Sequence, residues 1–150
     1  MKIEKSIIIN KTRSEVFSYL KFTRNQDNFS VWNMADPSMK KEHIGNDGTV
    51  GFIYRWDSEN KNVGAGEQET TAIIEGERID SALRFFRPMQ NTGTTSFVIS
   101  DGGNGSTRVT WIFDSPSKFP MVLFAPVFRI MLGKDLGQGL KNLKVLLEKK

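Results

Sequence analysis

Cysteine is absent from this chain of 150 residues. Without cysteine, the protein can hold neither a disulfide framework nor a thiolate nucleophile. Histidine occurs once, at His43, so no second imidazole is available for a metal site, and we can assemble no Ser/His/Asp arrangement. We therefore expect no metal centre and no cofactor.

Long apolar runs are also lacking. The longest one, from Phe119 to Phe128, stops at Arg129 and is too short to span a bilayer. The N-terminal sequence MKIEKSIIIN has three consecutive isoleucines but no small-residue cleavage site, which is unlike a secretory signal. These features predict a cytoplasmic protein without a transmembrane segment.

Charge of one sign is not concentrated in any block. The formal net charge of +4 comes from scattered lysines and arginines, and the basic ending KNLKVLLEKK reads as the solvated face of a helix. Nucleic-acid binding requires clustered cations interleaved with exposed aromatic residues. We therefore expect no nucleic-acid partner.

The most regular feature of the sequence is a long apolar periodicity near its end. Gaps of three and four residues predict one helical face, made of Met121, Phe124, Phe128, Leu132, Leu136, Leu140, Leu143 and Leu147. A helix from Pro120 to Glu148 would be about 43 Å long at 1.5 Å per residue. It is the only predicted element large enough to cover a sheet.

The rest of the chain predicts strands joined by tight turns. A first strand spans Lys2–Asn10, a short helix begins near Thr12 with capping-box spacing to Glu15, and a second helical or irregular segment covers Arg24–Trp32. Six further strands are expected at Met39–Ile44, Val50–Asp57, Gly66–Ile74, Ile79–Arg87, Thr94–Ser100 and Thr107–Asp114. We predict an α+β fold: one domain, residues 1–150, in which a curved antiparallel sheet of about seven strands grips the long helix.

Several short stretches are similar to a known family. They are GNDGTVG at 45–51, YRW at 54–56, VGAGE at 63–67, FRP at 86–88, TRVTW at 107–111 and GKD…GLKNLK at 133–144. With the order of elements, they resemble the helix-grip fold of the START-related (SRPBCC) superfamily, in its bacterial polyketide cyclase/dehydrase-like branch. The resemblance spans the whole chain. It implies a deep cavity between helix and sheet that receives a hydrophobic or amphipathic small molecule.

Alternation along the strands gives a candidate lining for such a cavity. Several aromatic residues share the predicted inner face of the sheet, and any one of them, taken alone, is more typical of an ordinary core. Polar groups such as Gln68 and Thr70 share the same face, however, and small-molecule sites combine apolar walls with a few polar groups. The candidate ligand-binding residues are Trp32, Phe52, Tyr54, Trp56, Gln68, Thr70, Phe85, Arg87, Phe97, Trp111, Phe128 and Met131.

Three functions remain open from the sequence. The first is binding of a lipid-like or polyketide-like molecule. The second is a polyketide cyclase/dehydrase-type enzyme, for which Tyr54 is the candidate that orients or protonates an enolate. The other residues that could act as acid or base are expected in solvent: His43 at a solvated edge, and Asp57, Glu67, Glu69 and Asp80 on the solvated outer face. The third is an interaction module, in which the apolar 121–132 segment docks on a partner protein, on a membrane surface or on a second copy as a homodimer.

Overall fold

The computed structural model describes residues 1–61, 63–87, 90–116 and 121–150, with residues 121–129 described by their backbone alone. Its elements follow the order β-α-η-α-β6-α. They are β1 (Lys2–Ile9), α1 (Arg13–Leu20), the 3-10 helix η1 (Thr23–Asn28), α2 (Val31–Met34), β2 (Lys40–Ile44), β3 (Ile53–Asp57), β4 (Ala65–Ile74), β5 (Arg78–Arg87), β6 (Asn91–Gly103), β7 (Ser106–Asp114) and α3 (Met121–Glu148).

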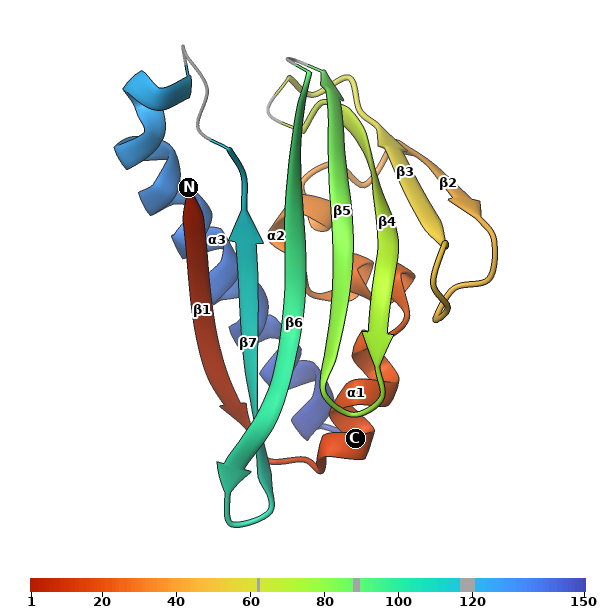
Figure 1. Cartoon of the computed structure of the whole chain (residues 1–150), viewed down its shortest axis with the longest axis vertical. Coiled ribbons are helices and arrows are strands. Elements are labelled where there is room, and N and C mark those ends of the chain that lie inside the picture. Colours follow the sequence, from red (N-terminus) through yellow and green to blue (C-terminus); the bar gives the residue numbers. More distant parts are fainter. Residues whose placement is uncertain (62, 88–89, 117–120) are drawn as a thin grey trace.

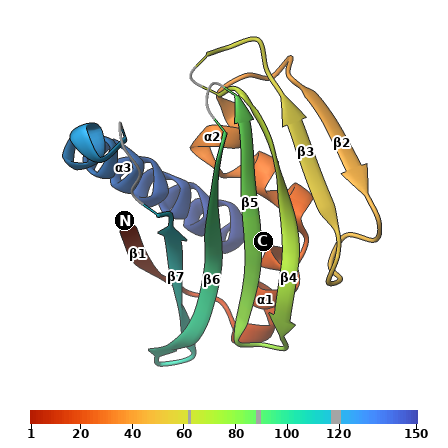
Figure 2. The ribbon, with the colours of Figure 1, turned by 45° about the horizontal axis from the view of Figure 1, so that its top comes forward.

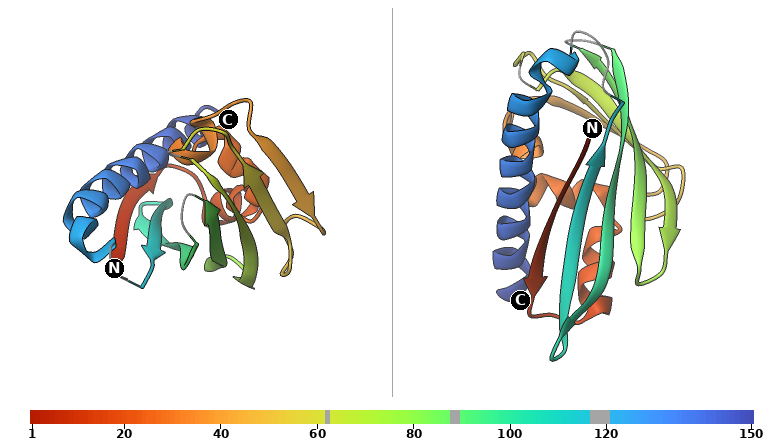
Figure 3. Two further views of the ribbon diagram at one scale, coloured as in Figure 1. Left: turned by 90° about the horizontal axis from the view of Figure 1, so that it is seen from above. Right: turned by 60° about the vertical axis from the view of Figure 1, so that its left-hand side comes forward.

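The strands within the described residues form one antiparallel sheet in the order β1-β7-β6-β5-β4-β3-β2 (Figure 1). Strands β2 to β7 pair in chain order, and β1 closes the far edge by pairing with β7. The sheet is curved, and the helices lie on its concave side (Figure 3). The predicted fold class is confirmed.

The concave face is apolar because side chains alternate along each strand. Ile79, Phe97 and Trp111 are paired across three neighbouring strands and define this face. Against it pack Val16, Phe17 and Leu20 of α1. The N-terminus of α1 is capped as predicted, since the Thr12 hydroxyl accepts the backbone N–H of Glu15 at 3.2 Å.

Helix α3 buries one stripe of leucines at the predicted spacing: Leu132, Leu136, Leu140, Leu143 and Leu147. It lies along β1 and also contacts β7 and α2. Gly139 permits a close approach to β7, because a Cβ atom there would lie 2.8 Å from the Trp111 ring. None of the helices in the described part of the chain combines the length and apolarity needed to cross a membrane.

Several boundaries differ from the sequence prediction. The segment predicted at Arg24–Trp32 is two elements, η1 and α2. Strand β3 begins at Ile53 instead of Val50, because residues 49–52 form a turn in which Phe52 N–H bonds the Thr49 carbonyl at 3.3 Å. Strand β6 begins at Asn91 instead of Thr94, because residues 91–93 also pair with β5.

Candidate functional site

One end of the concave face is solidly packed. The rings of Phe97 and Trp111 are stacked with their centroids 4.8 Å apart, and Phe29 meets both rings edge-on. All three are buried. The indole N–H of Trp111 donates to the Thr95 hydroxyl at 3.0 Å. Phe97 and Trp111 therefore lie on the predicted face, but they act as core.

Near the end where β5 finishes, the same face is less completely covered. Trp56 and Phe85 contact each other edge-to-face with centroids 6.0 Å apart, and both side chains are only half-buried. The Trp56 ring lies over Gly66, where a Cβ atom would be 2.8 Å from it. Solvent therefore reaches aromatic surface that points toward the helices.

A third half-buried aromatic side chain, Trp32, comes from α2. This helix lies on the concave side near the C-terminal end of β5 in both views (Figures 1 and 2). Trp32 packs against the core together with Phe85. Its indole nitrogen is buried and has no hydrogen-bond partner in the described part of the chain.

The two polar residues predicted on the inner face of β4 have different surroundings. Gln68 is paired with Tyr54 on one side and Leu83 on the other, and its half-buried amide makes no side-chain hydrogen bond to the residues described. Thr70 is fully buried, and its hydroxyl bonds that of Thr23 at 3.3 Å. The Gln68 amide thus has no side-chain partner among the residues described, whereas Thr70 ties β4 to η1.

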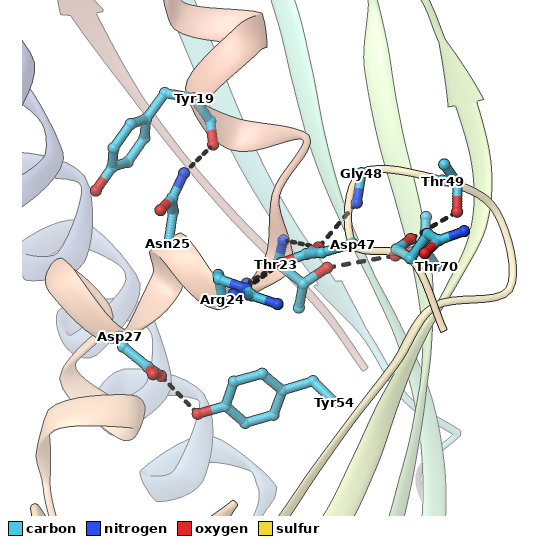
Figure 4. A network of polar contacts seen from close by, with 11 residues as sticks. Tyr19, Thr23, Arg24, Asn25, Asp27, Asp47, Gly48, Thr49, Tyr54 and Thr70 are labelled. Carbon is cyan, nitrogen blue, oxygen red and sulfur yellow. Dashed lines mark hydrogen bonds and ion pairs between the residues drawn. The ribbon is translucent and has the colours of Figure 1, made fainter. Parts of the chain in front are cut away.

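Tyr54 projects from β3 toward η1, where its hydroxyl donates to Asp27 at 2.5 Å (Figure 4). The same carboxylate accepts Asn33 Nδ2 at 3.0 Å and Lys41 Nζ at 3.2 Å. Burial, and then the hydrogen bond and charge of Asp27, raise the pKa of the Tyr54 phenol. The phenol therefore holds its proton tightly between two protein oxygens, which favours a structural role over transfer to an enolate.

No sequence pattern indicates the residues around Tyr54, because Asp27, Asn33 and Lys41 come from separate segments. The single histidine is exposed on edge strand β2, as expected. Its ring still packs on two aromatic residues, edge-on to Tyr54 at 5.1 Å and stacked with the buried Phe52 at 6.0 Å. No group of three metal-ligating His, Asp or Glu residues occurs within the described ranges.

Arg87 does not lie on the inner face, contrary to the prediction. The register shifts between Ala65 and Gly66, so Phe85 pairs with Gly66 while Arg87 pairs with Ala65. The extra residue reverses the alternation. The exposed Arg87 guanidinium forms an ion pair with Asp57 and donates to the Ser58 carbonyl at 3.1 Å.

Arg87 instead borders an open pocket of about 700 Å³ whose lining residues are mostly polar or charged, together with Met39, Lys40, Ser58 and Lys61. Asp36 also lines it and accepts the Ser58 and Ser38 hydroxyls at 2.5 and 2.8 Å. These hydrogen bonds, from Ser58 first, lower the pKa of Asp36. No pattern in the sequence predicts this pocket.

The GNDGTVG stretch at 45–51 has a structural role. Its carboxylate, Asp47, accepts the backbone N–H groups of Thr23 at 2.7 Å and Arg24 at 3.0 Å, and so holds the start of η1 (Figure 4). Gly45 and Gly51 have φ angles of 92° and 96°, which side-chain-bearing residues rarely adopt.

The outer-face carboxylates face outward as predicted, but they are not simply solvated. Glu67 is only 7% exposed. Its two oxygens accept Arg55 Nε at 2.8 Å and Arg84 Nε at 2.7 Å. Burial alone would raise the pKa of Glu67, but the hydrogen bonds and charges of the two arginines outweigh burial and lower it.

The predicted contribution of α3 is corrected in one case and lies outside the described side chains in the other. Met131 is 60% exposed and therefore does not line an interior surface. Phe128 belongs to the range described by backbone alone. The residues that combine an inward position with incomplete burial or an unused polar group are Trp32, Trp56, Gln68 and Phe85.

Comparison with known proteins adds information on the fold. A search against protein families found no match, and neither did a search of curated proteins. Among solved structures, a START superfamily protein from Mycobacterium smegmatis aligns with a TM-score of 0.66 and 16% identity over 99% of this chain and 97% of that protein. Ara h 8.0201 aligns with a TM-score of 0.61 and 13% identity over 100% and 99%.

DynU16, a protein of the dynemicin biosynthetic locus, aligns with a TM-score of 0.68 and 13% identity over 98% of this chain, which corresponds to 47% of DynU16. Identities this low are informative about the fold and not about the ligand or the chemistry. By its sheet order, its C-terminal helix and these neighbours, the chain has the helix-grip fold, which it shares with the START superfamily protein from Mycobacterium smegmatis and with Ara h 8.0201.

Proposed function

We propose that the protein binds a hydrophobic or amphipathic small molecule, lipid-like or polyketide-like, between the sheet and α3. The observation that carries the proposal is the incomplete burial of Trp56 and Phe85 on the concave face. Large aromatic side chains that point inward gain most from being covered. A bound apolar molecule supplies that cover, in line with the cavity that the sequence resemblance implies.

Polar groups near the same face give the proposed ligand its amphipathic character. Gln68 brings an amide with both donors and an acceptor, and Trp32 brings a donor. An apolar wall with a small number of polar groups is the usual composition of small-molecule sites. None of these groups is a carboxylate or an imidazole, so the proposal is binding without a catalytic step.

Two neighbouring phenylalanines on opposite faces of β5 allow a matched test. Phe85 is half-buried on the inner face, and Phe86 is exposed at the bulge. In fluorescence titrations with 1-anilinonaphthalene-8-sulfonate, we expect Phe85→Ala to weaken binding about threefold to tenfold, the effect of one aromatic contact. Phe86→Ala should leave the affinity unchanged. Equal effects of the two variants would place the dye on the outer surface and contradict the proposed site.

A second candidate function is docking of α3 on a partner protein, a membrane surface or a second copy of the chain. It is favoured by two adjacent large apolar residues on the solvent side of this helix, Ile130 and Met131, which are 72% and 60% exposed. Charged substitutions such as Met131→Lys would abolish such docking while leaving dye binding intact. The two candidates are therefore separable with one variant.

A further inference from the structure

The three tryptophans differ in what their indole N–H groups bond. Trp56 donates to the Val63 carbonyl at 3.3 Å and Trp111 to the Thr95 hydroxyl at 3.0 Å. The Trp32 nitrogen is buried without a partner in the described part of the chain. Buried polar groups in folded proteins are nearly always hydrogen-bonded, so an orphaned donor indicates a missing acceptor.

An ordered water molecule is a poor candidate for that acceptor. A buried water typically needs two to four polar partners. The Trp32 ring packs against the hydrophobic core, and the amide nitrogen of Asn33, the other polar side chain of its helix, is already bonded to Asp27. A bound organic molecule can instead bring an acceptor atom on an apolar body.

The position of Trp32 agrees with such an occupant. The indole is half-buried as a whole and packs against the same core as Phe85, near the incompletely covered end of the sheet. A molecule bound against Phe85 and Trp56 is therefore within the same part of the concave side as α2 (Figure 2).

We propose that the Trp32 indole N–H is the polar anchor of the bound molecule and donates a hydrogen bond to a neutral acceptor oxygen, of the ketone, ester or ether class. This inference rests on the proposed binding function. The indole nitrogen can only donate a hydrogen bond, so the bound molecule must supply an acceptor atom. It carries no charge, so it gives no particular advantage to a carboxylate.

A pair of probes that differ only in the acceptor tests the anchor. 2-Acetylnaphthalene and 2-ethylnaphthalene have nearly the same shape, and the first has a carbonyl oxygen that the second lacks. The three indole N–H resonances of ¹⁵N-labelled protein can be assigned with single Trp→Phe variants. We expect 2-acetylnaphthalene to move the Trp32 resonance downfield. The Trp56 and Trp111 resonances serve as controls, because their N–H groups already have acceptors.

Affinity measurements give an independent readout. Trp32→Phe keeps an aromatic ring and removes the donor, so it should weaken 2-acetylnaphthalene binding about fivefold to tenfold, the worth of one neutral hydrogen bond. Binding of 2-ethylnaphthalene should change less than about twofold. Equal losses for both probes, or a Trp32 resonance that responds equally to both, would overturn the anchor while leaving the binding function standing. Failure of both probes to bind the wild-type protein would contradict the binding function itself.

Discussion

Tyr54 and Glu67 lie on opposite faces of the sheet, and their pKa values are shifted in opposite directions. The pKa of Tyr54 is raised, and the pKa of Glu67 is lowered. Both are buried, but their partners differ. Tyr54 is next to the carboxylate of Asp27, which opposes ionisation of the phenol, whereas Glu67 is between two guanidinium groups, which favour ionisation of its carboxyl. Each residue therefore makes stability depend on pH in its own range.

For Tyr54, the pKa of the folded protein lies above that of the unfolded chain, which is about 10. Its contribution to stability is therefore complete below about pH 10 and is lost as the pH rises above that value. We expect Tyr54→Phe to lower the free energy of unfolding by about 1 kcal/mol at neutral pH, because one hydrogen bond is lost. Above pH 10, the stability of the Tyr54→Phe variant should decline less steeply with pH than that of the wild type.

Urea unfolding at a series of alkaline pH values, with tyrosinate absorbance recorded in parallel, measures both effects. Tyr19→Phe is the control, because Tyr19 is the only other tyrosine and its hydroxyl bonds an amide, Asn28, instead of a carboxylate. A folded wild-type protein in which Tyr54 ionises near its ordinary pKa would refute the assigned environment.

For Glu67, the folded pKa lies below the unfolded value, so its contribution is present above about pH 4.3 and is lost as the pH falls through the folded pKa. Glu67→Gln should lower the free energy of unfolding by about 1 kcal/mol at pH 7, a modest value because both arginines are partly exposed and screened. The difference from the wild type should shrink in acid. Thermal unfolding at neutral and acidic pH measures this, and an effect independent of pH would argue against the ion-pair interpretation.

For some side chains, the alternation along a strand is enough to predict the face of the sheet on which they lie. For others, the position or burial depends on bulges and strand register, which local spacing does not show. Trp56, Gln68 and Phe85 were placed correctly on the inner face, because period-two alternation survives as long as the register does. Arg87 was misplaced because a single extra residue at the bulge reverses the pattern, and no turn residue marks it. The burial of Glu67 follows from arginines on two neighbouring strands, which only the strand register brings together.

At the scale of elements, α3 combines helix-weakening glycines with close packing. Gly139 meets the Trp111 ring, Gly133 lies along the Lys5 stem, and a Cβ atom at Gly137 would have nothing within 4 Å. The apolar periodicity of this segment was sufficient to predict the helix and its buried stripe from Leu132 to Leu147, whereas Met121, Phe124 and Phe128 lie outside the described side chains. It was not sufficient to tell which glycine is required, because that depends on what lies opposite each one.

The glycines at 137 and 139 therefore give opposite expectations for the same substitution. Gly137→Ala should raise the free energy of unfolding by about 0.5–1 kcal/mol, because alanine has the higher helix propensity and meets no obstacle. Gly139→Ala should lower it by about 1–3 kcal/mol, because the added methyl group overlaps the Trp111 ring. Chemical denaturation followed by circular dichroism separates the two. Stabilisation by both substitutions would contradict the close approach of α3 to Trp111.

The connection between α1 and the second strand was less predictable than α3. Its sequence has no long periodicity, and its shape depends on polar contacts with distant residues, such as Asp47 at the start of η1 and Tyr54 at Asp27. Such contacts join residues more than twenty positions apart. A helix or strand assignment based on local spacing has no access to them.

At the scale of the whole molecule, the concave face of the sheet is fully packed at one end and incompletely covered at the other. Where Phe29, Phe97 and Trp111 meet, aromatic rings fill the space between the sheet and the helices. Where Trp56 and Phe85 lie, part of the aromatic surface remains open. This asymmetry is the basis for proposing a binding protein for an apolar small molecule.

Native mass spectrometry of gently purified protein, combined with organic extraction of the same sample, tests this proposal most directly. We predict a reproducible added mass that is lost on denaturation and is recovered as an apolar compound containing oxygen. The peaks of higher oligomers in the same spectrum report on docking through α3. A protein that carries no added mass, and that takes up neither naphthalene probe when these are supplied, would contradict the proposed function.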